Sequence, residues 1–283
     1  MPALKLVISN MKGGVSKTMT AIFLGNAFAE QHGLRTLIVD LDEQSPHPEK
    51  QKIVPTRELI PIAEALKLGR LDQVILPSKH YDNLFVTVGD QTIREDALAD
   101  VKEDRDKLLA RALDPLEKYF DVILIDTKQT FDLVTLNGIM AADLMVVPCD
   151  VDRDTLQSTI KTIQATQTWL HARPQIDPHN FFRILISNFD AQRDQMVNDW
   201  FYQQLAPYAQ YLFKTRIHRT THLKKARTMC LPLSKYIQEY DVGAPAAQRA
   251  VEDFNQLANE VLTLYEQTQN QEIIQPAGHT VGV

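Results

Sequence analysis

Six short apolar runs recur along the chain, and polar residues interrupt them little. They are rich in valine, isoleucine and leucine, which is typical of strands buried on both faces of a parallel sheet. The expected strands are residues 4–9, 36–39, 84–88, 122–125, 144–147 and 184–186. Longer segments lie between or after them, with apolar residues at helical spacing. The expected helices are residues 18–31, 105–119, 155–170 and 251–265.

This alternation of strand and helix predicts an α/β fold with a single doubly wound, mostly parallel sheet flanked by helices. We expect one domain over residues 1–269. Residues 42–69 are richer in proline and charge, so we expect a mobile insertion with a short helix there. Residues 270–283 are weakly patterned and are expected to fray.

Composition adds a constraint on partners and location. The 283 residues carry a net charge of −6, so a nucleic-acid partner would have to be met by a local basic patch. Cys149 and Cys230 lack the spacing of a metal site or a disulfide framework, which favours a reducing compartment. With no secretory signal and no apolar run of membrane-spanning length, we expect a cytoplasmic protein without stable membrane association.

A glycine-containing loop joins the first expected strand to the first expected helix. It consists of Lys12, Gly13, Gly14, Val15, Ser16, Lys17 and Thr18. A strand, a glycine loop and a helix form the context that a P-loop requires, with backbone N–H groups and the helix N-terminus facing phosphate. We expect Lys17 to reach the β- and γ-phosphates of a nucleotide and the Thr18 hydroxyl to bind Mg²⁺. A Gly-Gly turn with a solvated lysine is the competing interpretation.

Aspartates close two of the expected strands. Asp40 and Asp42 follow residues 36–39, and alternation puts both carboxylates on the same side. Asp126 ends residues 122–125 in a Walker B arrangement, whose carboxylate holds a magnesium-bound water. A sheet of this class binds ligands at the carboxyl ends of its strands. The competing interpretation is that these carboxylates only face solvent or cap strands.

The loop fits the pattern K-G-G-x-x-K-[ST] and so resembles the deviant Walker A loop of the ParA/MinD superfamily. This resemblance extends from residue 5 to about residue 265. It implies that Lys12 is the signature lysine, which crosses a dimer interface to the phosphates of the partner's ATP. Two facing ATP molecules concentrate negative charge, which a lysine from each side offsets. The resemblance therefore implies ATP and Mg²⁺ as cofactors, an ATP-dependent sandwich homodimer and ATPase activity.

The resemblance also implies roles for single residues. Asp42 would position the attacking water, and Asp40 would support the magnesium shell. Asn188 would contact adenine, and an asparagine that only forms a turn is the competing interpretation. Met19 belongs to the nucleotide-binding positions, although threonine is usual there.

The chain departs from the family pattern at several places. Ser16 replaces a usual glycine, residues 43–45 replace Pro-Gln-Gly, and residues 127–129 replace Thr-Pro-Pro. The lost prolines predict freer loops and slow hydrolysis. Lys128 is expected to reach phosphate or a partner chain.

Residues 211–236 are strongly basic and contain no aspartate or glutamate. We expect a DNA-backbone patch formed by Lys214, Arg216, Arg219, Lys224, Lys225 and Arg227. Residues 217–223 resemble the Ile-Pro-Arg-x-x-Arg-Leu segment of ParA proteins, and a dimer would present the patch twice. A solvated helix face is the competing interpretation.

Together these features favour a ParA-like partition ATPase. It would bind DNA non-specifically as an ATP-bound dimer and move a plasmid, a chromosome or another cargo, with a ParB-like or adaptor protein stimulating hydrolysis. The first alternative is a MinD-like membrane positioning ATPase, which needs a basic amphipathic C-terminal helix. Further alternatives are a redox ATPase resembling the nitrogenase iron protein, which needs cluster cysteines, and a metabolic P-loop ligase or kinase, against which Lys12 argues.

Overall fold

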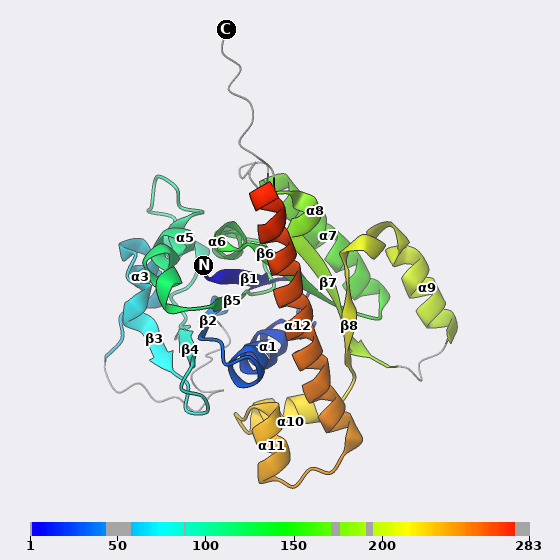
Figure 1. Ribbon diagram of the computed structural model, residues 1–283. Coiled ribbons are helices and arrows are strands. Elements are labelled where there is room, and N and C mark those ends of the chain that lie inside the picture. Colours follow the sequence, from blue (N-terminus) through cyan, green and yellow to red (C-terminus); the bar gives the residue numbers. More distant parts are fainter. Residues whose placement is uncertain (1, 44–57, 88, 171–175, 191–194, 275–283) are drawn as a thin grey trace.

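A twisted sheet forms the centre of the protein. The computed structural model describes residues 2–43, 58–87, 89–170, 176–190 and 195–274 (Figure 1). Within these residues the sheet has eight strands in the order β3-β4-β2-β5-β1-β6-β7-β8. Neighbouring strands are parallel except β3 and β4. The strands are β1 (Leu4–Ile8), β2 (Thr36–Asp40), β3 (Ile75–Pro77), β4 (Leu84–Thr87), β5 (Val122–Asp126), β6 (Leu144–Asp150), β7 (Phe182–Phe189) and β8 (Leu212–His218).

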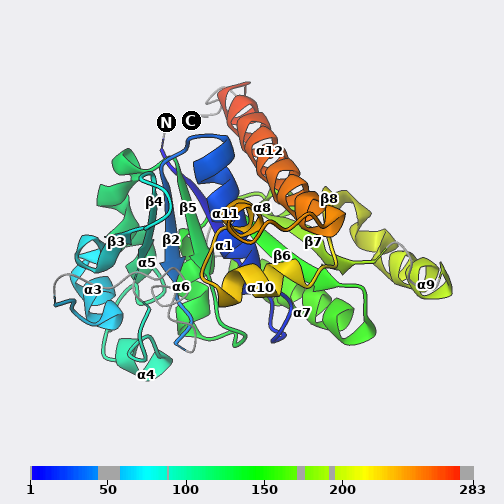
Figure 2. The same ribbon diagram turned by 90° about the horizontal axis from the view of Figure 1, so that it is seen from below.

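Helices cover both faces of this sheet (Figures 1 and 2). One core cluster joins one sheet face to α3, α5, α6, α7 and α9, and a second joins the other face to α1, α10, α11 and α12. The helices are α1 (Lys17–Gln31), α3 (Ile62–Leu68), α4 (Glu95–Leu98), α5 (Leu108–Leu113), α6 (Leu133–Ala141), α7 (Arg153–Leu170), α8 (Pro178–Phe181), α9 (Gln195–Leu205), α10 (His222–Thr228), α11 (Leu233–Glu239) and α12 (Pro245–Ile274), with 3₁₀ turns η1 (Leu71–Val74), η2 (Asp114–Tyr119) and η3 (Ala206–Tyr211).

The predicted fold class is confirmed, and all six expected strands are present. Two strands were missed. β3 has only three residues and ends in Pro77, while β8 alternates buried and exposed residues instead of forming an apolar run. The helix expected at 105–119 is also corrected: α5 ends at Leu113 and a 3₁₀ turn follows, with Pro115 near its start. Proline has no N–H to continue an α-helix.

The ends of two expected segments fall partly outside the described residues. The insertion expected at 42–69 contains the predicted short helix, α3, whereas residues 44–57 lie outside the description. The tail expected to fray from residue 270 begins inside α12, which continues to Ile274. Residues 275–283 lie outside the description.

Close packing fixes α1 against the sheet. A Cβ atom at Gly25 would lie 2.8 Å from a methyl carbon of Ile38 and 3.1 Å from one of Leu124, so the helix backbone approaches β2 and β5 closely. On its other side α1 contacts α12, where the rings of Phe23 and Phe254 lie 5.5 Å apart. The N-terminus of α1 is thereby held at the carboxyl end of the sheet.

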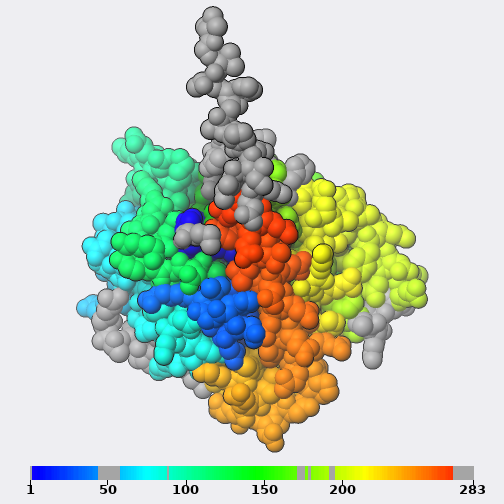
Figure 3. All heavy atoms as spheres, viewed as in Figure 1, coloured from blue at the N-terminus to red at the C-terminus, as the bar shows by residue number. Residues whose placement is uncertain are grey.

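Helix α12 also binds the backbone of the edge strand β8. The Glu260 carboxylate accepts hydrogen bonds from the N–H groups of Lys214 and Thr215, at 2.7 and 2.9 Å. The Asp253 carboxylate accepts one from the N–H group of His218 at 2.8 Å and lies 3.0 Å from its ring nitrogen. These contacts attach α12 to the edge of the sheet (Figure 3).

The packing at Gly25 generates a stability prediction. Gly25→Leu should lower the free energy of unfolding by about 1–3 kcal/mol, because the added side chain overfills the contact between α1 and the sheet. Urea denaturation followed by circular dichroism measures it. Gly243→Leu is the matched control, since a Cβ there meets nothing within 4 Å. Equal effects of the two substitutions would contradict the prediction.

Candidate functional site

The loop between β1 and α1 adopts an unusual backbone conformation. Gly14 and Ser16 both have positive φ angles, 81° and 65°. Glycine adopts this region freely, but serine rarely does, so Ser16 is held there by its surroundings. Ser16 is the N-cap of α1, yet its side chain makes no capping hydrogen bond. The first N–H groups of α1, which have no partner within the helix, are therefore not satisfied by the cap.

Lys17 lies at the centre of this loop. Its side chain is buried, and its ammonium group donates hydrogen bonds to the carbonyl oxygens of Asn10 and Lys12, both at 3.0 Å. Burial lowers the pKa of Lys17, and the carboxylates of Asp126 and Asp42 act in the opposite direction. The loop thus curls around a cation at the start of α1.

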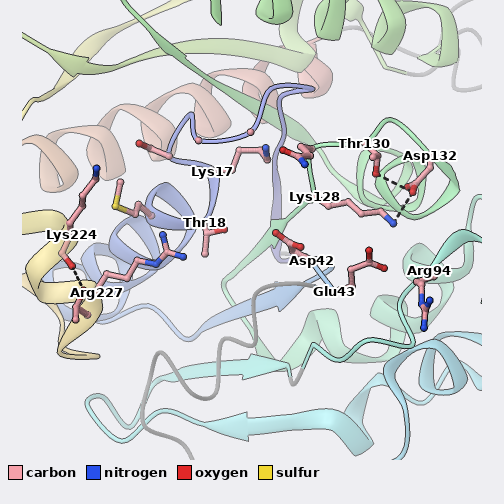
Figure 4. Close-up of a pocket in the computed structure, with 16 residues that line it drawn as sticks. Lys17, Thr18, Asp42, Glu43, Arg94, Lys128, Thr130, Asp132, Lys224 and Arg227 are labelled. Atoms are coloured by element: carbon pink, nitrogen blue, oxygen red, sulfur yellow. Dashed lines mark hydrogen bonds and ion pairs between the residues drawn. The ribbon is translucent and has the colours of Figure 1, made fainter.

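The predicted aspartates meet beside this cation. Asp40 and Asp126 end β2 and β5, face each other in register and are fully buried. The Asp40 carboxylate accepts a hydrogen bond from the N–H group of Asp42 at 3.0 Å. Figure 4 shows Asp42 beside Lys17 and Thr18. The strand order β2-β5-β1 therefore brings two acidic strand ends to the phosphate-type loop.

A cavity of about 900 Å³ opens over these groups. It is lined by Gly13, Gly14, Ser16, Lys17, Thr18, Met19, Asp42, Glu43, Arg94, Lys128, Gln129, Thr130, Asp132, Lys224, Arg227 and Thr228. The lining includes five basic side chains beside four acidic or hydroxyl groups of the loop and strand ends. Arg94 was missed, because no motif surrounds it in the sequence. Such a cationic cavity suits a polyanion.

A smaller hollow of about 300 Å³ adjoins the loop on its other side, lined in part by Met19, Asn188 and Arg219. Asn188 has a positive φ angle of 52°, and its side-chain amide donates to the Asp150 carboxylate at 2.8 Å. Burial raises the pKa of Asp150. Asn188 thus lies beside the loop with its side chain fixed. Val15 of the loop is buried and lines neither cavity.

Lys12 points away from the large cavity toward the start of α7. Its ammonium group lies 3.2 Å from an Asp152 carboxylate oxygen and donates to the Thr155 hydroxyl at 3.1 Å. Burial pushes the pKa of Asp152 upward, but hydrogen bonds from Thr155 and Lys12 outweigh it and leave that pKa below its ordinary value. The Lys12 side chain keeps a third of its surface exposed, at 33 %. It is a surface cation held by a carboxylate.

The structure divides the predicted DNA-binding residues into two groups. Lys214, Arg216 and Lys225 are exposed on β8 and α10. The guanidinium of Arg216 lies between the rings of Phe189 and Tyr202, at 4.8 and 5.1 Å from their centroids. Lys224 and Arg227 line the large cavity, and Arg219 and Lys224 line the smaller hollow, although Arg219 and Lys224 are also exposed. The basic stretch therefore contributes to both cavities as well as to the surface.

Cys149 and Cys230 form no disulfide with each other. Cys149 is buried in β6, and burial raises its pKa to about 12. Cys230 follows α10 and is partly buried. No group of three or more histidine, cysteine or acidic side chains in the described residues is arranged to hold a metal ion. The described helices also include none that is long and apolar enough to cross a membrane.

Comparisons with known proteins agree with this geometry. A sequence model described as an AAA domain matches residues 4–176. The chromosome-partitioning ATPase Soj of Treponema pallidum is 27 % identical over 235 residues, which cover 82 % of this chain and 89 % of that protein.

Two solved structures have a similar fold. Apo McdA from Cyanothece has a TM-score of 0.75 and 20 % identity, and the match covers 90 % of this chain and 98 % of McdA. Cobyrinic acid a,c-diamide synthase from Mycobacterium smegmatis, with a bound ATP analogue and magnesium, has a TM-score of 0.71 and 23 % identity, covering 93 % and 95 %.

The family match covers more than half of the chain, and its range contains the curled loop, the buried lysine and all three aspartates. Soj and further partitioning relatives match across about four fifths of the chain. On this evidence, the chain belongs to the AAA domain family and, within it, to the ParA/MinD superfamily of P-loop ATPases.

Proposed function

We propose that this protein is a ParA-like partition or positioning ATPase that binds ATP and Mg²⁺ in the large cavity. The observation that supports the proposal most directly is the meeting of Lys17, Thr18 and Asp42 in one cavity at the N-terminus of α1. The chromosome-partitioning ATPase Soj is similar to this chain in sequence, and McdA is similar to it in fold.

The residues of the cavity fit a magnesium-bound nucleoside triphosphate. The uncapped first turn of α1 offers N–H groups to phosphate oxygens, and Lys17 adds a full positive charge. Thr18, Asp40 and Asp126 provide the oxygen ligands that Mg²⁺ prefers, directly or through water. Mg²⁺ would stabilise negative charge on the transferred phosphate. Asn188 and the smaller hollow would hold the base.

Hydrolysis requires a water molecule held in line with the terminal phosphate. Asp42 lines the cavity together with Thr18, and its N–H group is bound to the Asp40 carboxylate. Its own carboxylate would accept a hydrogen bond from that water. Lys17 would stabilise the charge that develops on the phosphate oxygens. The loops after Asp42 and Asp126 lack the usual prolines, which supports a slow rate.

Lys12 supports the formation of an ATP-dependent homodimer. It is partly exposed and bound to Asp152, which also accepts hydrogen bonds from the N–H and hydroxyl groups of Thr155. Phosphate groups of a partner's nucleotide would compete for the ammonium group with Asp152 and with the carboxylate of Asp154, which lies 4.0 Å away. Exchange of Asp152 for phosphate would then couple ATP binding to association.

The exposed basic residues support DNA binding by the dimer. Lys214, Arg216 and Lys225 project from β8 and α10, and the protein as a whole is acidic, so this local charge favours a polyanionic partner. A ParB-like or adaptor protein would stimulate hydrolysis and couple it to a cargo. The membrane-positioning alternative has less support, because Phe254, Leu257 and Val261 of α12 are buried and its last turn carries no basic residue.

Replacing the buried lysine tests nucleotide binding. Lys17→Met should weaken ATP binding about 10- to 100-fold, since it removes the charged hydrogen bonds to phosphate. Isothermal titration with ATP and Mg²⁺ measures the change. Lys67→Met serves as the control, because Lys67 does not line the cavity and forms a surface ion pair with Asp100. Unchanged affinity in Lys17→Met would place the nucleotide elsewhere.

Replacing Lys12 tests dimer formation separately from ATP binding. Lys12→Ala should leave the ATP affinity of the monomer within about threefold and abolish most of the ATP-dependent dimer, because its ammonium group would act only across the interface. Light scattering with ADP, ATP and a slowly hydrolysed analogue reports the mass. A full ATP-dependent dimer in Lys12→Ala would refute the sandwich arrangement.

Charge reversal distinguishes the two groups of basic residues. The double variant Lys214→Glu with Lys225→Glu should weaken DNA binding at least tenfold and reduce its salt dependence, while ATP affinity stays unchanged. Arg227→Glu should instead weaken ATP binding, since Arg227 lines the cavity. Filter retention of DNA and titration with ATP measure these effects. Loss of DNA binding in Arg227→Glu alone, with normal ATP affinity, would reverse the assignment.

A further inference from the structure

The loop that joins β5 to α6, residues 127–132, lies directly on the phosphate loop. Both the N–H group and the hydroxyl of Thr127 donate to the carbonyl oxygen of Ile8, at 3.3 and 2.9 Å. Two residues later, the side chain of Gln129 lies against Gly13, where a Cβ atom would come within 2.1 Å of its amide oxygen. The backbone of Lys128 is therefore fixed beside the phosphate loop by the residues on both sides of it.

The side chain of Lys128 is bound to a carboxylate inside the cavity. Its ammonium group lies 2.7 Å from Asp132, and the two side chains are only 11 % and 17 % exposed. Both residues line the cavity that contains Lys17, Thr18 and Asp42. Figure 4 shows the Lys128 side chain extending along the cavity from the end of β5 to Asp132. The backbone of Lys128 thus lies beside the phosphate loop, while its ammonium group is held at Asp132 on the far side of the cavity.

Asp132 does not depend on Lys128 for its hydrogen bonds. It is the N-cap of α6 and accepts from the N–H groups of Val134 and Thr135, at 3.1 and 3.2 Å. It also accepts from the Thr130 hydroxyl at 3.1 Å. If the ammonium group left, the carboxylate would keep these three donors and the favourable field of the helix N-terminus. Exchange of the lysine therefore leaves no buried charge without a partner.

We propose that Lys128 binds the terminal phosphate of the nucleotide within its own subunit and returns to Asp132 when that phosphate is absent. This inference rests on the proposed nucleotide site and names a specificity residue within it. A terminal phosphate carries more negative charge than one carboxylate, so it attracts the ammonium group more strongly. The flexible four-carbon stem of lysine allows the change of partner. In ADP the loop and Lys17 would hold the β-phosphate and no γ-phosphate competes with Asp132, so Lys128 favours ATP over ADP.

The test is the ratio of ATP to ADP affinity in the full chain. Isothermal titration with each nucleotide and Mg²⁺ gives both values for the wild type, Lys128→Gln, Lys128→Arg and Asp132→Asn. Lys128→Gln should weaken ATP binding about tenfold and leave ADP binding within about twofold. Lys128→Arg, which keeps the charge, should retain most of the preference for ATP. Asp132→Asn keeps a capping side chain but removes the competing charge, so ATP binding should tighten severalfold.

The control is a surface pair of similar geometry. Lys107 and Asp104 form an ion pair at 2.8 Å outside the cavity, so Lys107→Gln should change neither affinity. Equal losses of ATP and ADP affinity in Lys128→Gln, or no loss in either, would overturn the proposal, and thermal unfolding without nucleotide confirms that the variant is folded. A wild-type chain that binds neither nucleotide would instead overturn the proposed function itself.

Discussion

A buried ammonium group constrains the whole carboxyl edge of this sheet. Lys17 is almost without solvent, so its charge must be met by groups of the protein or of a ligand. Its own loop supplies two carbonyl oxygens, and Asp126 and Asp42 supply the opposite charge from the ends of two strands. This compensation works only because β5 and β2 follow β1 in the sheet. The site therefore depends on the strand order. The close contact of Gly25 with the sheet fixes the position of α1 relative to these strand ends.

Two further lysines near this edge are each bound to an aspartate at the start of a helix. Lys12 is held by Asp152 and Lys128 by Asp132, and each aspartate also accepts a hydrogen bond from a backbone N–H group three residues later, at Thr155 and at Thr135. An aspartate at a helix start is already satisfied by N–H groups and by the helix dipole. Each lysine can therefore leave its carboxylate at small cost. Lys17, held by carbonyl oxygens inside the loop, has no such freedom.

Much of this arrangement could be predicted from the sequence, because its signals are local. Continuous apolar runs identify strands buried on both faces, and a residue after such a run lies at the carboxyl edge, which located Asp40 and Asp126. β8 escaped detection because its outward residues are polar, as expected of a strand at the border of the sheet. The direction of a side chain is harder to predict.

Helix α10 illustrates this second difficulty. Lys224, Arg227 and Thr228 recur at the spacing of one helix face and line the cavity, whereas Lys225 lies one residue around the helix and does not line it. The sequence shows only that basic residues cluster there. Which face of a seven-residue helix turns inward depends on α11 and α12, which contact it and come later in the chain. Arg94 reaches the same cavity from a loop without any pattern of its own.

The carboxylates that α12 presents to β8 have a consequence for assembly. A border strand with open N–H groups invites a strand of another molecule to extend the sheet across subunits. Here Glu260 and Asp253 already occupy the N–H groups of three residues of β8, and the opposite border, β3, is three residues long and ends in a proline. Continuous sheets and fibre-like stacking through these borders are thereby disfavoured. Reversible association is left to side-chain surfaces, which a small charged ligand can make or break.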